Sequence, residues 1–161
     1  MFNIMLGRYE EYIEMDELEL EFQLDSQLAA DTIKLGDFPL SSVLLMNDSQ
    51  YPWLILVPRR AGMTEIYHLS AEDQQQMLQE TSALAQALSD IFGAKKMNVA
   101  NLGNMVSQLH IHVIARLESD PAWPGPVWGK VPALPYNADE LASVQKRLDA
   151  LLTGEVAFTP A

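Results

Sequence analysis

Two of the three histidines in this chain lie two residues apart, within residues 108–114, which read Gln-Leu-His-Ile-His-Val-Ile. Apolar residues alternate there with Gln108, His110 and His112, and this alternation is the pattern of a half-buried β-strand. Side chains on a strand change face at every residue, so we expect these three on one face, about 6.7 Å apart along it. An amide and two imidazoles on one strand face indicate a chemical site.

Two kinds of chemistry fit a strand that carries His-x-His. Neutral imidazoles coordinate metal ions, and an imidazole can also attack phosphorus while its neighbour donates hydrogen bonds to the phosphate oxygens. A metal needs further ligands, but His68, the remaining histidine, lies near a predicted helix start, and no carboxylate has convincing ligand spacing. A metal site and a pair of structural histidines bonded to backbone groups stay open as alternatives.

The turn before the strand favours phosphate chemistry. Residues 98–107 are rich in small amides, and Gly103 allows the backbone to approach a ligand closely. Turns of this kind can direct N–H groups at an anion. We therefore expect a phosphate site that needs neither a metal nor another cofactor.

The composition is that of a globular domain. The 161 residues are 48% hydrophobic and 20% charged, which is typical of a folded chain of one domain. No apolar run approaches the roughly 18 residues of a membrane span, and the first residues lack the basic start of a signal peptide. The absence of cysteine excludes disulfides, thiolate zinc sites and a cysteine nucleophile. We expect a cytoplasmic protein without a membrane partner.

The charge of the chain bears on its partners. A net charge of −12 argues against binding to long nucleic acid. Much of the acid lies in residues 10–21, within what we interpret as an acidic, solvated N-terminal extension over residues 1–21. The few basic residues follow predicted strands, Arg59 and Arg60 after one and Arg116 after the histidine strand. A small anion is therefore still a possible ligand.

The surrounding sequence predicts an α+β fold. Hydrophobic periodicity indicates helices over residues 22–31, 71–92 and 138–152. It indicates strands over residues 32–46, where one or two strands are broken at residues 36–39, and over residues 53–57 and 97–101. Ser70 and Asn137 are the predicted N-caps of the second and third helices, and Gly93 is the predicted stop of the second. The strand over 97–101 is expected to pair with the histidine strand around Gly103.

In this order the motifs resemble the histidine triad (HIT) superfamily of nucleotide hydrolases and transferases. The matching features are a strand that ends in Leu-Ile-Leu-Val-Pro-Arg-Arg, a long helix, an Asn101-x-Gly103 turn, and a His-φ-His strand closed by Ile-Ala-Arg, where φ is an apolar residue. The resemblance covers about residues 32–118. The segment that follows, residues 120–129, is rich in proline and tryptophan and resembles a bacterial HIT-like branch.

The resemblance implies a fold and an assembly. It implies a single HIT-like domain over residues 1–161, in which an antiparallel sheet of about five strands is flanked by helices. Residues 119–161 form its C-terminal segment and helix. Proteins of this family usually pair into a homodimer through the long helix and a continuous sheet, so we expect a homodimer here.

The family motif is His-φ-His-φ-His-φ-φ, and its roles transfer unevenly. The middle histidine, which takes the nucleoside phosphoryl group, corresponds to His110. The last histidine, which contacts phosphate and assists the leaving group, corresponds to His112. The first position is Gln108, so the triad is incomplete. A further family histidine, on the strand before the Val-Pro pair, is replaced by Trp53.

The resemblance also implies a set of substrate-binding residues. Asn101 matches the turn asparagine near the phosphates, and Asn47 or Asp48 falls near the loop acid that usually holds the ribose. Arg116 suits either a charge near the phosphates or a salt bridge at the strand end. The implied substrate-binding residues are Asn47, Asp48, Trp53, Asn101, Gly103, Asn104 and Arg116.

The predicted function is that of a nucleotide phosphohydrolase or nucleotidyltransferase acting through a covalent nucleotidyl-histidine on His110. A nucleotide or another nucleoside phosphate is the expected partner. Gln108 can form hydrogen bonds but cannot shuttle a proton, so turnover is expected to be slowed or redirected. The alternatives are a catalytically weak, nucleotide-binding HIT-like protein and a metal-binding His-x-His protein. Trp123 and Trp128 are candidates for capping the site, for a subunit contact or for packing.

Overall fold

The structure, a computed structural model, describes residues 21–161, so the expected acidic extension lies outside the described residues except for Glu21. The described residues form one antiparallel sheet with the strand order β4-β5-β3-β2-β1-β6. Its strands are β1 (Thr32–Asp37), β2 (Ser41–Met46), β3 (Trp53–Pro58), β4 (Lys96–Ala100), β5 (Ile111–Arg116) and β6 (Thr159–Pro160). The helices are α2 (Ser26–Asp31), α3 (Ala71–Phe92) and α4 (Ala138–Leu148), with 3₁₀ turns at η1 (Ile66–His68) and η2 (Asp149–Thr153).

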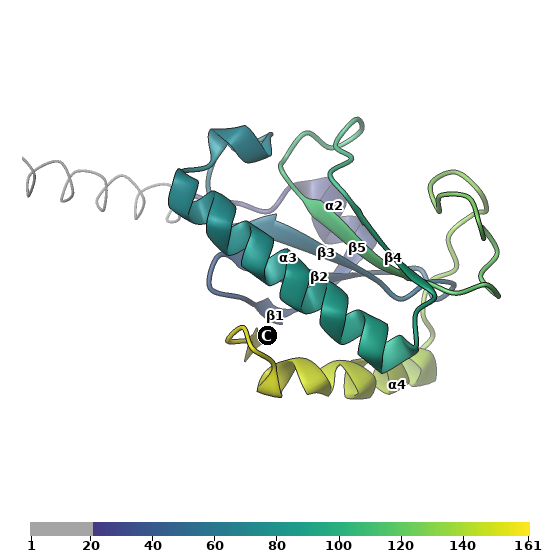
Figure 1. Ribbon diagram of the computed structural model, residues 1–161. Helices are drawn as coiled ribbons and strands as arrows, with labels where there is room; N and C mark the ends of the chain where they lie inside the picture. Colours follow the sequence, from purple (N-terminus) through teal and green to yellow (C-terminus); the bar gives the residue numbers. More distant parts are fainter. Residues whose placement is uncertain (1–20) are drawn as a thin grey trace, which may run out of the picture.

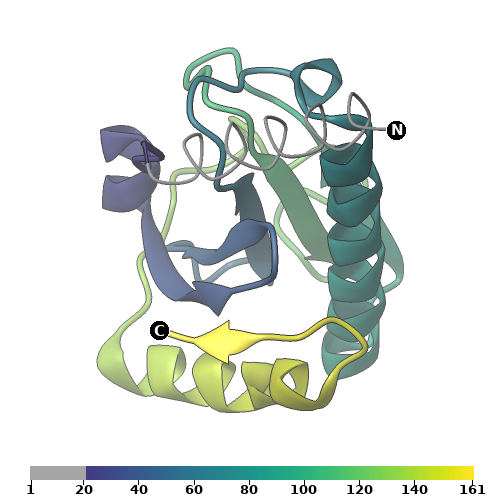
Figure 2. The same ribbon diagram turned by 90° about the vertical axis from the view of Figure 1, so that its left-hand side faces the viewer.

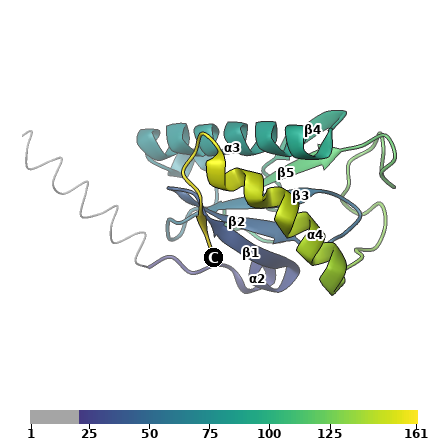
Figure 3. The same ribbon diagram turned by 90° about the horizontal axis from the view of Figure 1, so that it is seen from below.

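The long helix α3 covers one face of the sheet, and α2 lies on the other side (Figures 1 and 3). The bounds of α3 are those predicted from the sequence. The Ser70 side chain accepts from the backbone N–H of Asp73 at its start, and Gly93 ends it in the left-handed conformation with φ 62°. Its apolar stripe, which includes Leu84 and Leu88, is buried against the sheet together with residues of α4.

The alternation of side chains along the central strands divides the interior into two layers. In β3, Leu54 and Leu56 pack toward α3, whereas Trp53, Ile55 and Val57 pack on the opposite face. All are buried, because a cluster of apolar side chains covers each face of β3. This central pair of strands, β3 and β5, therefore presents a second apolar face that α3 does not cover.

The sheet has six strands rather than the expected five. The additional strand, β6, pairs with β1 and lies beside α4 (Figure 2). It comes so close to Gly36 that a Cβ atom there would collide with the Thr159 carbonyl and the Phe158 ring. A strand of only two residues has no periodicity of its own, so the sequence gives no signal for it.

Other elements differ from the prediction at their ends. The first helix starts at Ser26 rather than at residue 22, because Asp25 is its N-cap. The last helix ends at Leu148 and continues as the 3₁₀ turn η2. The histidine strand starts at Ile111, so Gln108 and His110 precede it. Within residues 21–161 no helix is both long and apolar enough to cross a membrane.

Candidate active site

A small cavity of about 200 Å³ opens on the face of the sheet that α3 does not cover. Its walls come from α2, from the ends of β1 and β2, from β3 and β5, and from the two loops that flank β5. The lining residues are Leu28, Asp31, Thr32, Met46, Trp53, Ile55, Leu102, Asn104, Met105, Val106, His110, His112 and Trp128. The walls are thus apolar apart from a few side chains, and the two imidazoles lie together among them.

His110 lies directly before β5, with its side chain almost fully buried. Its Nδ1 is 2.6 Å from the backbone carbonyl oxygen of Gln108. A carbonyl only accepts, so this distance requires a proton on Nδ1. In the neutral imidazole the lone pair is then on Nε2, which is the nucleophilic nitrogen.

His112 has the opposite tautomer. The indole Nε1–H of Trp53 donates to His112 Nδ1 across 3.0 Å. Because an indole N–H is a donor only, Nδ1 must carry the lone pair and Nε2 the proton. His112 Nε2 is buried and has no hydrogen-bond partner among the described residues. This N–H borders the cavity, with the backbone of Leu102 as its nearest polar neighbour, and it can donate to a ligand atom there.

The two imidazoles lie side by side, and His110 offers a lone pair on Nε2 where His112 offers an N–H. Their ring centroids are 4.8 Å apart in an edge-to-face arrangement. Burial, followed by the charge of His110, lowers the pKa of His112 to about 4, although the backbone of Leu102 acts in the opposite direction. His112 is consequently uncharged at neutral pH.

An aromatic shell holds His112 in place. Trp53 lies edge-to-face against Tyr51 and Trp128, with ring centroids 6.3 and 5.8 Å apart. Trp128 also lies 5.2 Å from the His112 ring. Contacts of this kind are favourable geometries for aromatic rings. Trp128 lines the cavity and packs against the apolar cluster on this face of the sheet.

The Gln108 side chain does not join the two imidazoles. Its Oε1 accepts from the backbone N–H of Asp25 at 2.9 Å, and its Nε2 donates to the carbonyl of Gln23 at 2.8 Å. The Gln108 amide is thus engaged by the segment that leads into α2, rather than by the histidines. Gln108 takes part in the site through its backbone carbonyl alone.

The residues of the turn before β5 lie on two different sides of the sheet. Gly103 is so close to His110 that a Cβ atom there would lie 4.0 Å from its Cε1 and 3.0 Å from the Val106 carbonyl oxygen. Asn104 lines the cavity. Asn101, however, lines a different groove, beside α3. The structure thus brings Gly103 and Asn104 to the histidines, but not Asn101.

Asn47 and Asp48 have structural partners rather than a place in the cavity wall. Asn47 Oδ1 accepts from the backbone N–H of Tyr136, and Asp48 Oδ1 accepts from that of Leu134. These bonds attach the segment before α4 to the loop after β2. Within residues 21–161, the one carboxylate that lines the cavity is Asp31, at the end of α2. Sequence reasoning missed it, because nothing local shows that α2 folds over the histidine strand.

Arg116 forms the salt bridge that was one of its two expected roles. Its side chain is 2% exposed and is bonded to Asp120 through Nε and Nη2. It also donates to Asn98 Oδ1 and to the Gly125 carbonyl. Arg116 does not line the cavity. The structure thus gives Arg116 the salt-bridge role, since these bonds hold it at the base of the loop after β5.

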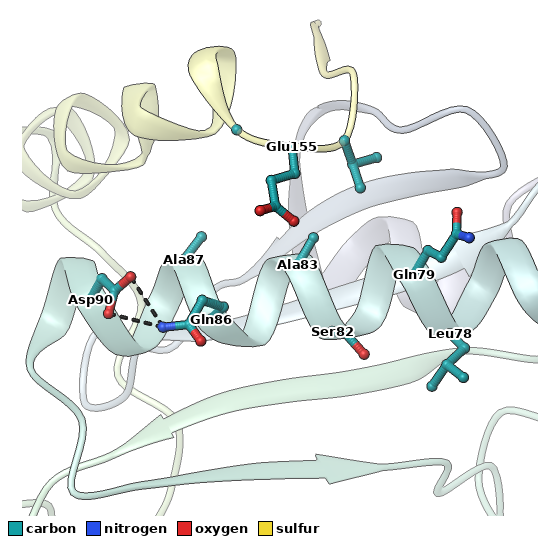
Figure 4. Close-up of a pocket in the computed structure, with 10 residues that line it drawn as sticks. Leu78, Gln79, Ser82, Ala83, Gln86, Ala87, Asp90 and Glu155 are labelled. Atoms are coloured by element: carbon teal, nitrogen blue, oxygen red, sulfur yellow. Dashed lines mark hydrogen bonds between the residues drawn. The ribbon is translucent and has the colours of Figure 1, made fainter.

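A larger groove of about 760 Å³ runs along the outer side of α3, beside residues 154–156 (Figure 4). Its polar groups include Gln86, which donates to the carboxylate of Asp90, and Glu155. No histidine lines it, and two carboxylates would repel a phosphate. Within the described part of the chain, no three His, Asp or Glu side chains gather as a metal site requires. The cavity with the two histidines is therefore the candidate active site.

Comparisons with known proteins agree with this assignment. A family model described as the HIT domain matches residues 27–119. The comparison with curated proteins gives no match. A solved histidine triad protein from Marinobacter aquaeolei VT8 is 57% identical with a TM-score of 0.80, covering 82% of this chain and 96% of that one.

Two further solved structures are similar over most of their length. A histidine triad protein from Bradyrhizobium japonicum is 46% identical with a TM-score of 0.78, covering 80% of this chain and 96% of that one. A histidine triad (HIT) protein from Sinorhizobium meliloti 1021 is 45% identical with a TM-score of 0.79, covering 82% of this chain and 98% of that one. At these identities the likeness extends beyond the fold to the sequence itself.

Proposed function

Since the chain belongs to the histidine triad (HIT) family, we propose that it is a nucleotide phosphohydrolase or nucleotidyltransferase that forms a covalent nucleotidyl-histidine on His110. The observation that carries this proposal is the protonation pattern of the two imidazoles. The Gln108 carbonyl keeps the proton of His110 on Nδ1 and leaves the lone pair on Nε2. The neighbouring His112 presents an Nε2–H without a partner among the described residues.

Each group has a role in the first step. His110 Nε2 attacks the α-phosphorus, and the bond to the leaving group breaks. As positive charge develops on the His110 ring, the Gln108 carbonyl stabilises it through Nδ1–H. His112 Nε2–H donates to an oxygen of the phosphoryl group, where negative charge accumulates. In the second step water, or another acceptor, takes the nucleotidyl group from His110.

The walls of the cavity suit the nucleoside part of such a substrate. Leu28, Met46 and Val106 supply apolar surface, and Asp31 supplies a carboxylate that can accept from ribose hydroxyls. The volume of about 200 Å³ is below the roughly 300–1,000 Å³ of common ligand pockets. The cavity therefore encloses one part of the nucleotide. The rest extends past Met105, which is 97% exposed.

A nucleotide-binding protein with weak turnover is the second candidate. It is favoured by the position of Gln108, whose amide is bonded to Gln23 and Asp25 and so leaves the site with two imidazoles instead of three. The metal-binding alternative is less favoured, because His112 Nδ1 already accepts from Trp53. A cytoplasmic location stays a prediction from the sequence.

The proposed assembly is a homodimer through α3 and β4. Within the described sheet β4 pairs only with β5, so its outer edge is free to pair with a second copy. A groove of about 600 Å³ lies beside it, with walls that include Leu78 on α3 and Val99 on β4, both exposed. Sedimentation analysis of the full chain, with Val99→Lys as the variant expected to form monomers, tests this assembly.

The function is tested by incubating the full chain with an adenosine phosphoramidate and with a dinucleoside polyphosphate. We expect nucleotide release, and a sample quenched with denaturant at alkaline pH, where a phosphorus–nitrogen bond survives, is expected to gain the mass of one nucleotidyl group. His110→Ala is expected to abolish both. His68→Ala is the matched control, since His68 is exposed and does not line the cavity. Release that persists in His110→Ala would contradict the histidine nucleophile. Binding without release would favour the second candidate.

A further inference from the structure

We propose that Trp53 holds His112 in a single neutral tautomer, and that the site therefore accepts nucleotides whose leaving group departs as a stable oxyanion, as from a phosphoric anhydride, rather than as an amine. The choice of leaving group rests on the nucleotidyl transfer proposed above, whereas the tautomer does not. The two parts are consequently open to separate tests.

The geometry of Trp53 makes its N–H a fixed donor. The residue begins β3, next to β5 in the sheet, and its indole is buried between Tyr51 and Trp128. From there Nε1–H donates to His112 Nδ1 across 3.0 Å. An indole has no lone pair on nitrogen with which to accept a hydrogen bond. The indole therefore cannot adapt if the protonation of its partner changes.

This contact disfavours the imidazolium form of His112. A proton on Nδ1 would place two N–H groups against each other 3.0 Å apart, with loss of the existing hydrogen bond. Burial acts in the same direction, since a charged ring would lose its water. The lowered pKa of His112, about 4, agrees with this geometry. His112 is thus a hydrogen-bond donor, but not a source of protons, at neutral pH.

Among the residues that the structure describes, no other group in the cavity is placed to supply a proton to a leaving group. The remaining titratable lining residues are His110 and Asp31. His110 carries its proton on Nδ1, which is bonded to the Gln108 carbonyl on the opposite side of the ring from the nucleophile. Asp31 Oδ2 accepts from the side chain of Gln27. The donor beside the phosphoryl group is accordingly the neutral Nε2–H of His112.

The absence of a proton donor decides which leaving groups can depart in the first step. The bond from His110 Nε2 to phosphorus forms, and the electron pair of the breaking bond leaves with the departing atom. The bridging oxygen of an anhydride departs as a phosphate oxyanion, which is stable in water and needs no proton. The nitrogen of an amine would depart as an unstable anion unless a proton arrived first. The adduct keeps its proton on Nδ1; water then attacks phosphorus, releases a proton to solvent and restores the His110 lone pair.

The tautomer is tested by ¹⁵N NMR of the imidazole rings in the labelled full chain. We expect His112 to show a protonated Nε2 with a bare Nδ1, and His110 to show the reverse. Trp53→Phe keeps an aromatic ring and removes the N–H donor, so we expect the pure tautomer of His112 to be lost. Trp128→Phe is the matched control, because Trp128 contacts the His112 ring without a hydrogen bond to its Nδ1. A protonated Nδ1 in the wild type, or an unchanged tautomer in folded Trp53→Phe, would overturn the proposal.

The leaving group is tested with two substrates that carry the same nucleotidyl group. At pH 7 we expect kcat/KM for diadenosine triphosphate to exceed that for an adenosine alkylphosphoramidate by about 100-fold or more, the contribution that a general acid commonly makes. Equal or faster release of the amine would overturn the preference while leaving the His110 nucleophile intact. Absence of release and of adduct with both substrates would instead overturn the proposed function, and the NMR result would still decide the tautomer.

Discussion

The two faces of the β3–β5 pair differ in chemistry, although their side chains alternate along the same two strands. Toward α3, Leu54 and Leu56 of β3 meet Ile111 and Val113 of β5 in an aliphatic core. On the opposite face the same strands carry Trp53 and His112, which are joined by a hydrogen bond. The first face needs only volume and apolarity. The second also needs one donor placed opposite one acceptor, so a different set of substitutions should affect each face.

His110→Gly is expected to have the largest effect, and the effect should be confined to activity. Removal of the nucleophile should lower nucleotide release by roughly 1,000-fold or more. The side chain adjoins the cavity, so free imidazole in the buffer should restore part of the rate. Nucleotide release measured with and without imidazole checks this expectation. A rate that imidazole does not change, in a variant shown by its thermal transition to be folded, would argue against His110 as nucleophile.

Leu84→Ala probes the opposite face. Leu84 is fully buried in the core between α3 and the sheet, and such truncations cost about 2–5 kcal/mol. We expect the free energy of unfolding in urea to fall by this amount, with kcat per folded molecule unchanged. Gln79→Ala, at an exposed position of the same helix outside the proposed dimer groove, is the control and should leave stability almost unchanged. Altered catalysis in folded Leu84→Ala would show that the two faces are not independent.

The elements with strong local signals were the ones that the sequence predicted well. Ser70, Asn137 and Gly93 cap the ends of helices, and the structure has each cap where the sequence indicated it. The fold class follows from the order of these elements. Strand β6 could not be predicted, because its pairing with Gly36 depends on residues more than a hundred positions apart.

Within the site, the residue types were predictable but their partners were not. The hydrogen bond between Trp53 and His112 joins residues that are 59 positions apart and depends on the pairing of β3 with β5. The burial of Arg116 likewise depends on how the loop after β5 folds, because Asp120 and Gly125 of this loop are its partners. For Gln108 the partners of the side chain could not be predicted, since Asp25 and Gln23 lie 83 and 85 positions away in the sequence.

The protonation of His112, on the face of the sheet with the candidate site, should change the free energy of unfolding with pH. His112 has a pKa of about 4 in the folded protein and about 6.5 when unfolded. Between these values the unfolded chain binds a proton that the folded protein excludes, so stability falls as the pH is lowered from 6.5 to 4. The total loss is about 3 kcal/mol. Urea unfolding of the wild type and of His112→Gln at several pH values measures this loss: the difference in stability between the two proteins should change between pH 6.5 and 4 and be constant above pH 7. Parallel pH profiles would contradict a buried neutral His112.

The smallest effect is expected when the family triad is completed by Gln108→His. This variant distinguishes the role of the backbone carbonyl of residue 108 from that of its side chain. In Gln108→His the sequence would read His-φ-His-φ-His, yet the side chain at this position points to residues 23–25 and not to the cavity. The variant should lose two hydrogen bonds, which are worth about 1 kcal/mol each. It should keep the carbonyl that fixes the His110 tautomer, because that group belongs to the backbone. We therefore expect a slightly less stable protein whose rate of nucleotide release is unchanged. A tenfold gain in that rate would mean that the side chain of residue 108 turns into the cavity during turnover, and that the incomplete triad limits the enzyme.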